Sequence, residues 1–127
     1  MKQIKRLKRE KVSLFLAAAV LSLGILSGCG GESKEAKEAR MTGIEQLNAG
    51  NYQDAIDSFG KALDESDGIV NSFELDVLKY RGEAEYKLAD YKAAAQTYGI
   101  LAEVDGGKAE YLYYKAASEA AAGQAED

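Results

Sequence analysis

Two segments of the chain carry the same pattern of apolar residues. In each segment the apolar positions follow one another in steps of 3, 1, 3, 3 and 1, which places them in one stripe along a helix. The two sets differ by 39 at every position, and they are Tyr52, Ala55, Ile56, Phe59, Ala62 and Leu63, and Tyr91, Ala94, Ala95, Tyr98, Leu101 and Ala102. The pattern predicts two copies of one amphipathic helix.

The repetition extends beyond these two helices. Gly43 and Gly82 precede them at the same offset, as do Gly50 and Ala89. A third, partial copy follows at a spacing of 34, where Leu112, Ala116 and Gly123 match Leu78, Gly82 and Ala89. Repeats of this length indicate antiparallel helix hairpins that stack on one another. We therefore expect an all-α fold with helices near 34–49, 52–65, 72–88, 91–104 and 108–122, the fifth of which caps the array or docks on another molecule.

Particular side chains should mark the helix ends and the close contacts between helices. Helix starts are indicated by Asn51, by Asp90, and by Asn71 with Glu74 three residues later, and helix ends by Gly68, Gly106 and Gly123. We expect Gly43 and Gly82 to let a neighbouring helix approach closely, with Ala55 and Ala94 facing that contact. The large rings of Tyr52, Phe59, Tyr91 and Tyr98 should fill the gaps between hairpins.

The first part of the chain follows a different pattern. Residues 1–11 carry six Lys and Arg and one Glu, and residues 12–26 carry no charge. A basic start before a short apolar core is the architecture of a bacterial export signal. As a helix the core would span about 22 Å, short of the ~30 Å of hydrocarbon that a stable membrane span prefers. A permanent single-span anchor is the alternative.

Charge and composition restrict the chemistry of the remaining chain. Without residues 1–11, 10 of the 16 Lys and Arg and 20 of the 21 Asp and Glu remain, for a net charge near −10. This balance opposes binding to nucleic acid or to anionic lipid surfaces. One Cys and no His exclude internal disulfides, His-based catalytic triads and the common zinc sites, so we expect no enzyme activity, no metal and no cofactor. Asp57 with Lys61 and Glu83 with Lys87 are predicted surface ion pairs.

The single cysteine lies where the apolar core ends. Leu26, Ser27, Gly28 and Cys29 resemble the lipobox of bacterial lipoprotein signal peptides. The resemblance implies removal of a signal peptide, residues 1–28, attachment of diacylglycerol to the Cys29 sulfur, and usually acylation of the new amine, with palmitate as the expected acyl chain. Other readings of a lone Cys are a buried core residue or a redox thiol. Residues 29–35 would then form a lipidated start and flexible spacer.

The helical part resembles tetratricopeptide (TPR) repeats. The motif positions are Gly43, Gly50, Tyr52, Ala55, Phe59 and Ala62 in the first repeat, and Gly82, Ala89, Tyr91, Ala94, Tyr98 and Leu101 in the second. The resemblance covers 36–124, with repeats at about 36–69 and 75–108, a partial repeat at 109–124 and a tail at 125–127. It implies a short α-solenoid of two repeats and a capping helix. Ala89 at a turn position, and the missing Pro at the end of each repeat, depart from the family pattern.

The same resemblance implies a peptide-binding groove formed by the first helix of each hairpin. Its candidate residues are Lys37, Arg40, Ile44, Leu47, Asn48 and Asn51, then Asp76, Lys79, Glu83, Tyr86, Lys87 and Asp90, and finally Tyr113. Tyr86 and Tyr113 are the expected anchors, because tyrosine offers a large contact area with few rotatable bonds. The alternative is that both rings pack only against neighbouring helices.

These resemblances together predict a lipid-anchored module that binds a protein or peptide partner outside the cytoplasm. The expected location is the outer face of the cell membrane, or the outer membrane if the host has two, because Gly30 rather than Asp follows Cys29. Two other hypotheses remain open. One is self-association through the fifth helix, giving a homo-oligomer. The other is an accessory subunit of a cell-wall enzyme that acts through carboxylates such as Glu83 and Asp76.

Overall fold

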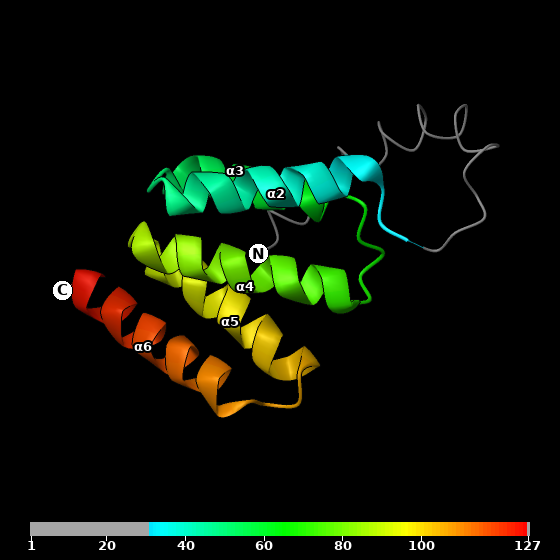
Figure 1. The fold of residues 1–127 in the computed structure, drawn as a ribbon. Coiled ribbons are helices and arrows are strands. Elements are labelled where there is room, and N and C mark those ends of the chain that lie inside the picture. Colours follow the sequence, from blue (N-terminus) through cyan, green and yellow to red (C-terminus); the bar gives the residue numbers. More distant parts are fainter. Residues whose placement is uncertain (1–30, 127) are drawn as a thin grey trace. The chain divides into compact units, whose positions relative to one another are not determined.

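The computed structural model describes residues 31–126, and within this range the chain forms five α-helices and no strand. Residues from Lys34 onward make one compact unit (Figure 1). The expected all-α class is confirmed, and the expected helix ends differ from the observed ones by at most four residues. The helices are α2 (Lys34–Asn48), α3 (Tyr52–Ala62), α4 (Ser72–Lys87), α5 (Tyr91–Val104) and α6 (Ala109–Glu126).

Each helix packs against the next one along the chain. The pairs α2 with α3, α4 with α5 and α5 with α6 are in contact, α3 also packs on α4, and α2 touches α4. Figure 1 shows α2 and α3 side by side, then α4 and α5, then α6 beyond α5. The buried side chains of these pairs form one apolar core, in which Phe59, Val77 and Leu101 are enclosed completely.

The two hairpins are held by the same glycine contact. A Cβ atom added to Gly43 would lie 2.5 Å from the Phe59 ring, and one added to Gly82 would lie 3.1 Å from the Tyr98 ring. The predicted close approach of helices at both glycines is therefore confirmed. Ala55 and Ala94 are fully buried beside these contacts, also as expected.

A polar pair between facing helices also recurs at the offset of 39, half-buried in the first hairpin and buried in the second. The Ser58 hydroxyl donates a hydrogen bond to Oε1 of Gln46 (2.6 Å), and the Thr97 hydroxyl donates one to Oε1 of Glu85 (2.5 Å). A stacked pair of aromatic rings also recurs, with its first ring 39 residues and its second ring 34 residues further along the chain. Phe59 stacks on Tyr80 with centroids 6.0 Å apart, and Tyr98 stacks on Tyr114 at 5.0 Å. The second stack joins α6 to the array.

The turn inside each hairpin has the same backbone course. Gly50 and Ala89 both have positive φ angles, +80° and +64°. The following amides donate to equivalent carbonyls, Asn51 to Gln46 (2.8 Å) and Asp90 to Glu85 (2.9 Å). Glycine adopts this conformation freely, whereas alanine has a Cβ atom that makes it costly by about 1 kcal/mol. The second turn is therefore the strained one.

Two of the six predicted helix-end signals are wrong, and a third is confirmed only in its position. Asn51 directly precedes α3, as predicted, but its side chain accepts no capping hydrogen bond, whereas Asp90 accepts one from the amide of Ala93. Gly68 follows the end of α3 by six residues, because Leu63 already terminates that helix, and Gly123 lies inside α6, which continues to Glu126. The other three predictions are confirmed: Asn71 and Glu74 form a reciprocal capping box, Asp90 caps α5, and Gly106 follows the end of α5 with a φ of +69°.

Candidate functional site

The predicted lipidation motif lies outside the residues that the structure describes. Leu26, Ser27, Gly28 and Cys29 therefore remain a prediction from the sequence. Within residues 31–126, no helix has both the length and the apolar character needed to cross a membrane. In that same range, no three Cys, His, Asp or Glu side chains are grouped in a way that could hold a metal ion.

An open hollow lies between α2 and α4, the first helices of the two hairpins. Its volume is about 370 Å³, and it is lined by Lys37, Arg40, Met41, Ser72, Phe73 and Asp76. Met41 is exposed and Phe73 is half-buried, so apolar surface is available beside the charged groups. Three of the predicted groove residues, Lys37, Arg40 and Asp76, meet here. The structure therefore brings together one part of the predicted groove.

An ion pair forms the side of this hollow. Nε of Arg40 lies 2.6 Å from Oδ2 of Asp76, and both side chains are partly exposed. The Arg40 guanidinium also lies over the Tyr80 ring, 5.6 Å from its centroid. Because the pair joins α2 to α4 and the ring supports the guanidinium, Arg40 is held in place without being withdrawn from solvent.

A second hollow of about 380 Å³ continues along α2. Its lining residues are Lys34, Lys37, Glu38, Met41, Thr42 and Glu45. Lys37 and Met41 belong to both hollows, so they connect the two depressions. Lys34 and Glu38 form an ion pair of 3.6 Å at this site, and both are well exposed. The charge along this surface is mixed rather than of one sign.

Other predicted groove residues are occupied by the fold itself. Leu47 is only 5% exposed and belongs to the core, so its assignment to a binding surface is wrong. Ile44 packs against the same core. Its position one turn before Leu47 puts both side chains on the inner face of α2, since residues three or four apart share a face. Asn48 and Asn51 are exposed at the turn after α2, as is Asp90 at the turn after α4.

The predicted anchors Tyr86 and Tyr113 differ in their surroundings. Tyr86 is half-buried and makes edge contacts with Tyr91 (5.3 Å) and Tyr114 (6.2 Å). Tyr113 is 68% exposed, and its ring makes an edge contact with the Tyr114 ring, with the two centroids 5.4 Å apart. Tyr114 therefore links the two. Tyr114 was not among the predicted residues. The sequence repeat could have indicated it, because Tyr114 matches Tyr80 at the offset of 34.

The polar groove candidates on α4 are engaged in local interactions. Lys87 forms a 2.8 Å ion pair with Glu83, as predicted, and their hydrogen bond raises the pKa of Lys87. Lys79 lies 5.9 Å from the centroid of Tyr111, and a hydrogen bond with Tyr111 raises the pKa of Lys79. Asp57, which we expected beside Lys61, accepts a hydrogen bond from Gln53 (3.1 Å). All of these groups sit at the surface or near it.

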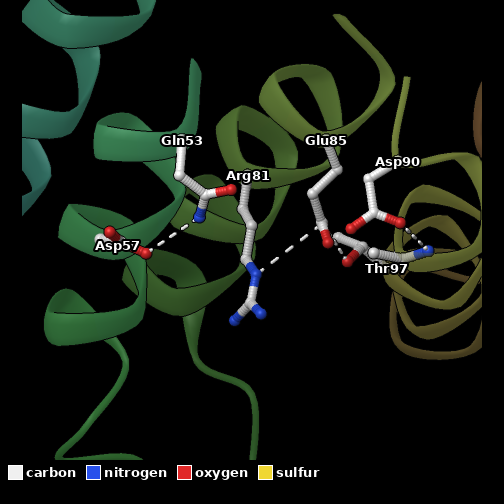
Figure 2. A network of polar contacts seen from close by, with 7 residues as sticks. Gln53, Asp57, Arg81, Glu85, Asp90 and Thr97 are labelled. Carbon is white, nitrogen blue, oxygen red and sulfur yellow. Dashed lines mark hydrogen bonds and ion pairs between the residues drawn. The ribbon is translucent and has the colours of Figure 1, made fainter. Parts of the chain in front are cut away.

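Glu85 is a buried carboxylate that was not among the predicted site residues. Figure 2 shows it between Arg81 of its own helix and Thr97 of α5. Only 2% of Glu85 is exposed, and burial raises the pKa of its carboxyl group, opposed by the Thr97 hydrogen bond and by Arg81. Since it is enclosed between α4 and α5, no substrate reaches it. The sequence repeat could have indicated this position, because Glu85 aligns with Gln46 at the offset of 39.

No protein-family model matches the chain, and no curated protein or solved structure matches it either.

Proposed function

We propose that this chain is a lipid-anchored lipoprotein whose helical domain binds a protein partner outside the cytoplasm. In this proposal residues 1–28 are a signal peptide, Cys29 carries the lipid, and residues 36–124 form a short TPR-like α-solenoid. The location would be the outer face of the cell membrane, or the outer membrane in a host with two. We assign it no catalytic residue and no cofactor other than the covalent lipid.

The observation that carries the binding proposal is the hollow between α2 and α4. It places the exposed apolar side chain of Met41 beside Lys37 and the fixed guanidinium of Arg40. A depression with apolar, cationic and anionic atoms on rigid helices fits a peptide better than a small molecule, which requires a more enclosed cavity. Exposed Tyr113 adds a further contact of low entropic cost.

Repetition at fixed offsets supports the solenoid part of the proposal. The glycine contact, the hydroxyl hydrogen bond, the turn and the ring stack all recur with the spacing of the sequence repeat. In arrays of this kind each unit contacts mainly its neighbours, which leaves one face of the first helices available to partners. The position of α2 against α4 agrees with this arrangement.

The sequence before the domain supports the anchor. A basic start, an uncharged core and Leu26, Ser27 and Gly28 precede the only Cys of the chain. Diacylglycerol and an added acyl chain together hold a protein on a bilayer durably, at about 0.8 kcal/mol for each buried methylene, whereas one chain binds only transiently. Labelling cells with a palmitate analogue tests this step, and we expect label on the native chain and none on Cys29→Ala.

Crosslinking in cells followed by affinity purification tests the binding proposal. We expect one envelope protein in near-equal amount with the native chain, reduced at least fivefold by Lys37→Glu with Met41→Glu and lost with Cys29→Ala. Tyr86→Ala and Tyr113→Ala test the predicted anchors in the same assay. Glu103→Lys is the matched control, because Glu103 is exposed on α5 and lies in neither hollow. Equal recovery with the double variant would refute the role of the hollow.

A further inference from the structure

One long face of α6 has no partner within the domain. Helix α6 uses Tyr111 and Ser118 to pack on α5, and its opposite side presents Leu112 (50% exposed), Tyr113, Ala116, Ala120 and Gly123. Two of the equivalent residues of α4 are covered, because Leu78 and Gly82, at the offset of 34 from Leu112 and Ala116, are buried, whereas Lys79, the equivalent of Tyr113, is exposed. The part of the α6 face around Leu112 and Ala116 therefore matches a packed surface of α4 but remains open to solvent.

This face is complementary to itself. Tyr113, Ala116, Ala120 and Gly123 follow one another in steps of 3, 4 and 3, a spacing that reads the same in both directions about residue 118. If two copies of α6 lie antiparallel with their two-fold axis at residue 118, Tyr113 faces Gly123 twice and Ala116 faces Ala120 twice. The largest side chain then meets the smallest residue, and the alanines let the helices approach closely.

The open space required by this pairing is present. Nothing lies within 4 Å of a Cβ atom built on Gly123, and Tyr113 is largely exposed. The domain also packs antiparallel helices in the same manner, because an aromatic ring covers a glycine at Gly43 with Phe59 and at Gly82 with Tyr98. A pair of α6 helices would repeat between copies a contact that the chain already makes twice within itself.

Charge on the edge of the face fits the same pairing. Lys115 and Glu119 lie on one side of the stripe, with Nζ of Lys115 3.8 Å from Oε1 of Glu119, and both side chains are partly exposed. In an antiparallel pair the same edges of the two helices meet. With the axis at residue 118, the charges follow along the pair in the order Lys115, Glu119 of the other copy, Glu119, and Lys115 of the other copy. Each lysine therefore lies near a glutamate of the other copy.

We propose that the open face of α6 binds a second copy of this chain, forming an antiparallel, two-fold symmetric helix pair centred on residue 118. The interface is isologous, so its growth stops at the dimer. It leaves the hollow between α2 and α4 uncovered, because that hollow is lined by residues of those two helices only. The dimer thus presents two copies of this hollow, and its Tyr113 rings take part in the pairing instead of contacting a partner protein.

Disulfide crosslinking of full-length chains tests the register directly. Ala116→Cys and Ala120→Cys are made separately in a Cys29→Ser background, purified in mild detergent, and oxidised alone or as a mixture. We expect a covalent dimer at least tenfold stronger in the mixture than in either variant alone, because the axis places residue 116 opposite 120. Gln53→Cys mixed with Asp57→Cys is the matched control, four residues apart and exposed on α3 (Figure 2).

A second variant separates loss of pairing from loss of folding. Gly123→Leu fills the space for Tyr113, so we expect at least a tenfold weaker crosslink. Its melting temperature should be unchanged or higher, because leucine favours an exposed helix position by about 0.8 kcal/mol over glycine.

Three results would each overturn the proposal. The first is a mixture that crosslinks no more strongly than the control pair. The second is a stronger crosslink in the Ala116→Cys variant oxidised alone than in the mixture, because this would place the axis at residue 116. The third is an unchanged crosslink after Gly123→Leu is added, since the filled space would then not be part of the interface.

Discussion

At the scale of single residues, the two hairpins fill one equivalent polar position, half-buried at Gln46 and buried at Glu85, with different chemistry. Gln46 in the first hairpin and Glu85 in the second each accept a hydrogen bond from a hydroxyl of the facing helix. The amide is neutral, whereas an ionised carboxylate loses hydration when it is buried and compensates only partly through its partners. Glu85 is therefore the position where the second hairpin carries an electrostatic cost that the first does not.

Replacing this carboxylate should stabilise the domain at neutral pH. Burial raises the folded-state pKa of Glu85 above its ordinary value of 4.5. Between the unfolded and folded pKa values the native state binds the extra proton, so stability falls as pH rises through this window. We expect Glu85→Gln to raise the free energy of unfolding above the folded pKa, with a gain that shrinks toward pH 4.

Urea unfolding of both chains from pH 4 to pH 8 measures this difference. The substituted amide has a precedent in the same protein, because Gln46 makes the equivalent hydrogen bond to Ser58. The loss of the 3.7 Å contact with Arg81 offsets part of this gain, because the Arg81 side chain is only 24% exposed and its Nε atom is buried. A variant that is less stable than the native chain by the same amount at every pH would contradict the expectation.

At the scale of helices, the glycine contacts determine how closely each hairpin packs. Gly43 has no room for a methyl group, because Phe59 occupies the space, whereas Gly60 of α3 has no atom within 4 Å of its added Cβ. Both glycines lie inside helices, so the intrinsic preference for alanine is the same at the two positions. Only the neighbouring helix distinguishes them.

The pair Gly43→Ala and Gly60→Ala therefore separates packing from helix propensity. We expect Gly43→Ala to lower the free energy of unfolding by about 1–3 kcal/mol, because the Phe59 ring must leave its position. Gly60→Ala should raise it by about 0.5–1 kcal/mol. Chemical denaturation of both variants is the measurement. Equal effects of the two substitutions would show that the close contact between α2 and α3 does not contribute to stability.

At the scale of the whole domain, α6 is part of the common core rather than an appendage. Tyr111 is 3% exposed and belongs to the same apolar cluster as Phe59 and Leu101, and Tyr114 stacks on Tyr98 of α5. A third helix layer of this kind supplies buried area that two hairpins alone would lack. The stability of the hairpins should therefore depend on the docking of α6.

Two tyrosines of α6, two residues apart, test this dependence. Tyr111→Ala removes a buried ring and should lower the free energy of unfolding by about 3 kcal/mol, as for other large core side chains. Tyr113→Ala removes an exposed ring and should change it by no more than about 0.5 kcal/mol. Thermal unfolding followed by circular dichroism is sufficient. A small effect of Tyr111→Ala would mean that α6 folds independently of the array.

Much of the fold was accessible from local patterns. Apolar periodicity predicts α3 and α5, because a helix must bury one stripe of its surface, and the repeat extends the prediction to the other three helices. The offset of 39 predicts the matching contacts of Gly43 and Gly82. Helix ends were less accessible. Asn51 and Asp90 share the same backbone course, yet only Asp90 accepts a capping bond. Small differences in side-chain position decide such bonds.

The candidate site was predicted less completely than the fold. The hollow gathers Lys37, Arg40 and Asp76 as expected, but the core buries Leu47, and Tyr86 packs against other rings. Helix periodicity places a residue on a face, and it does not say how far a neighbouring helix covers that face. The structure alone determines that Leu47 points inward while Tyr113 stays exposed.

The amino-acid sequence alone is thus enough to define the helical class, the two-hairpin repeat and the motif around Cys29, because these depend on the order and spacing of residue types along the chain. The tertiary structure is needed to place Glu85 in a buried position, to form the hollow beside Arg40, and to leave one face of α6 open. Those features depend on which surfaces meet when helices distant in the sequence pack together, and no local pattern contains that information.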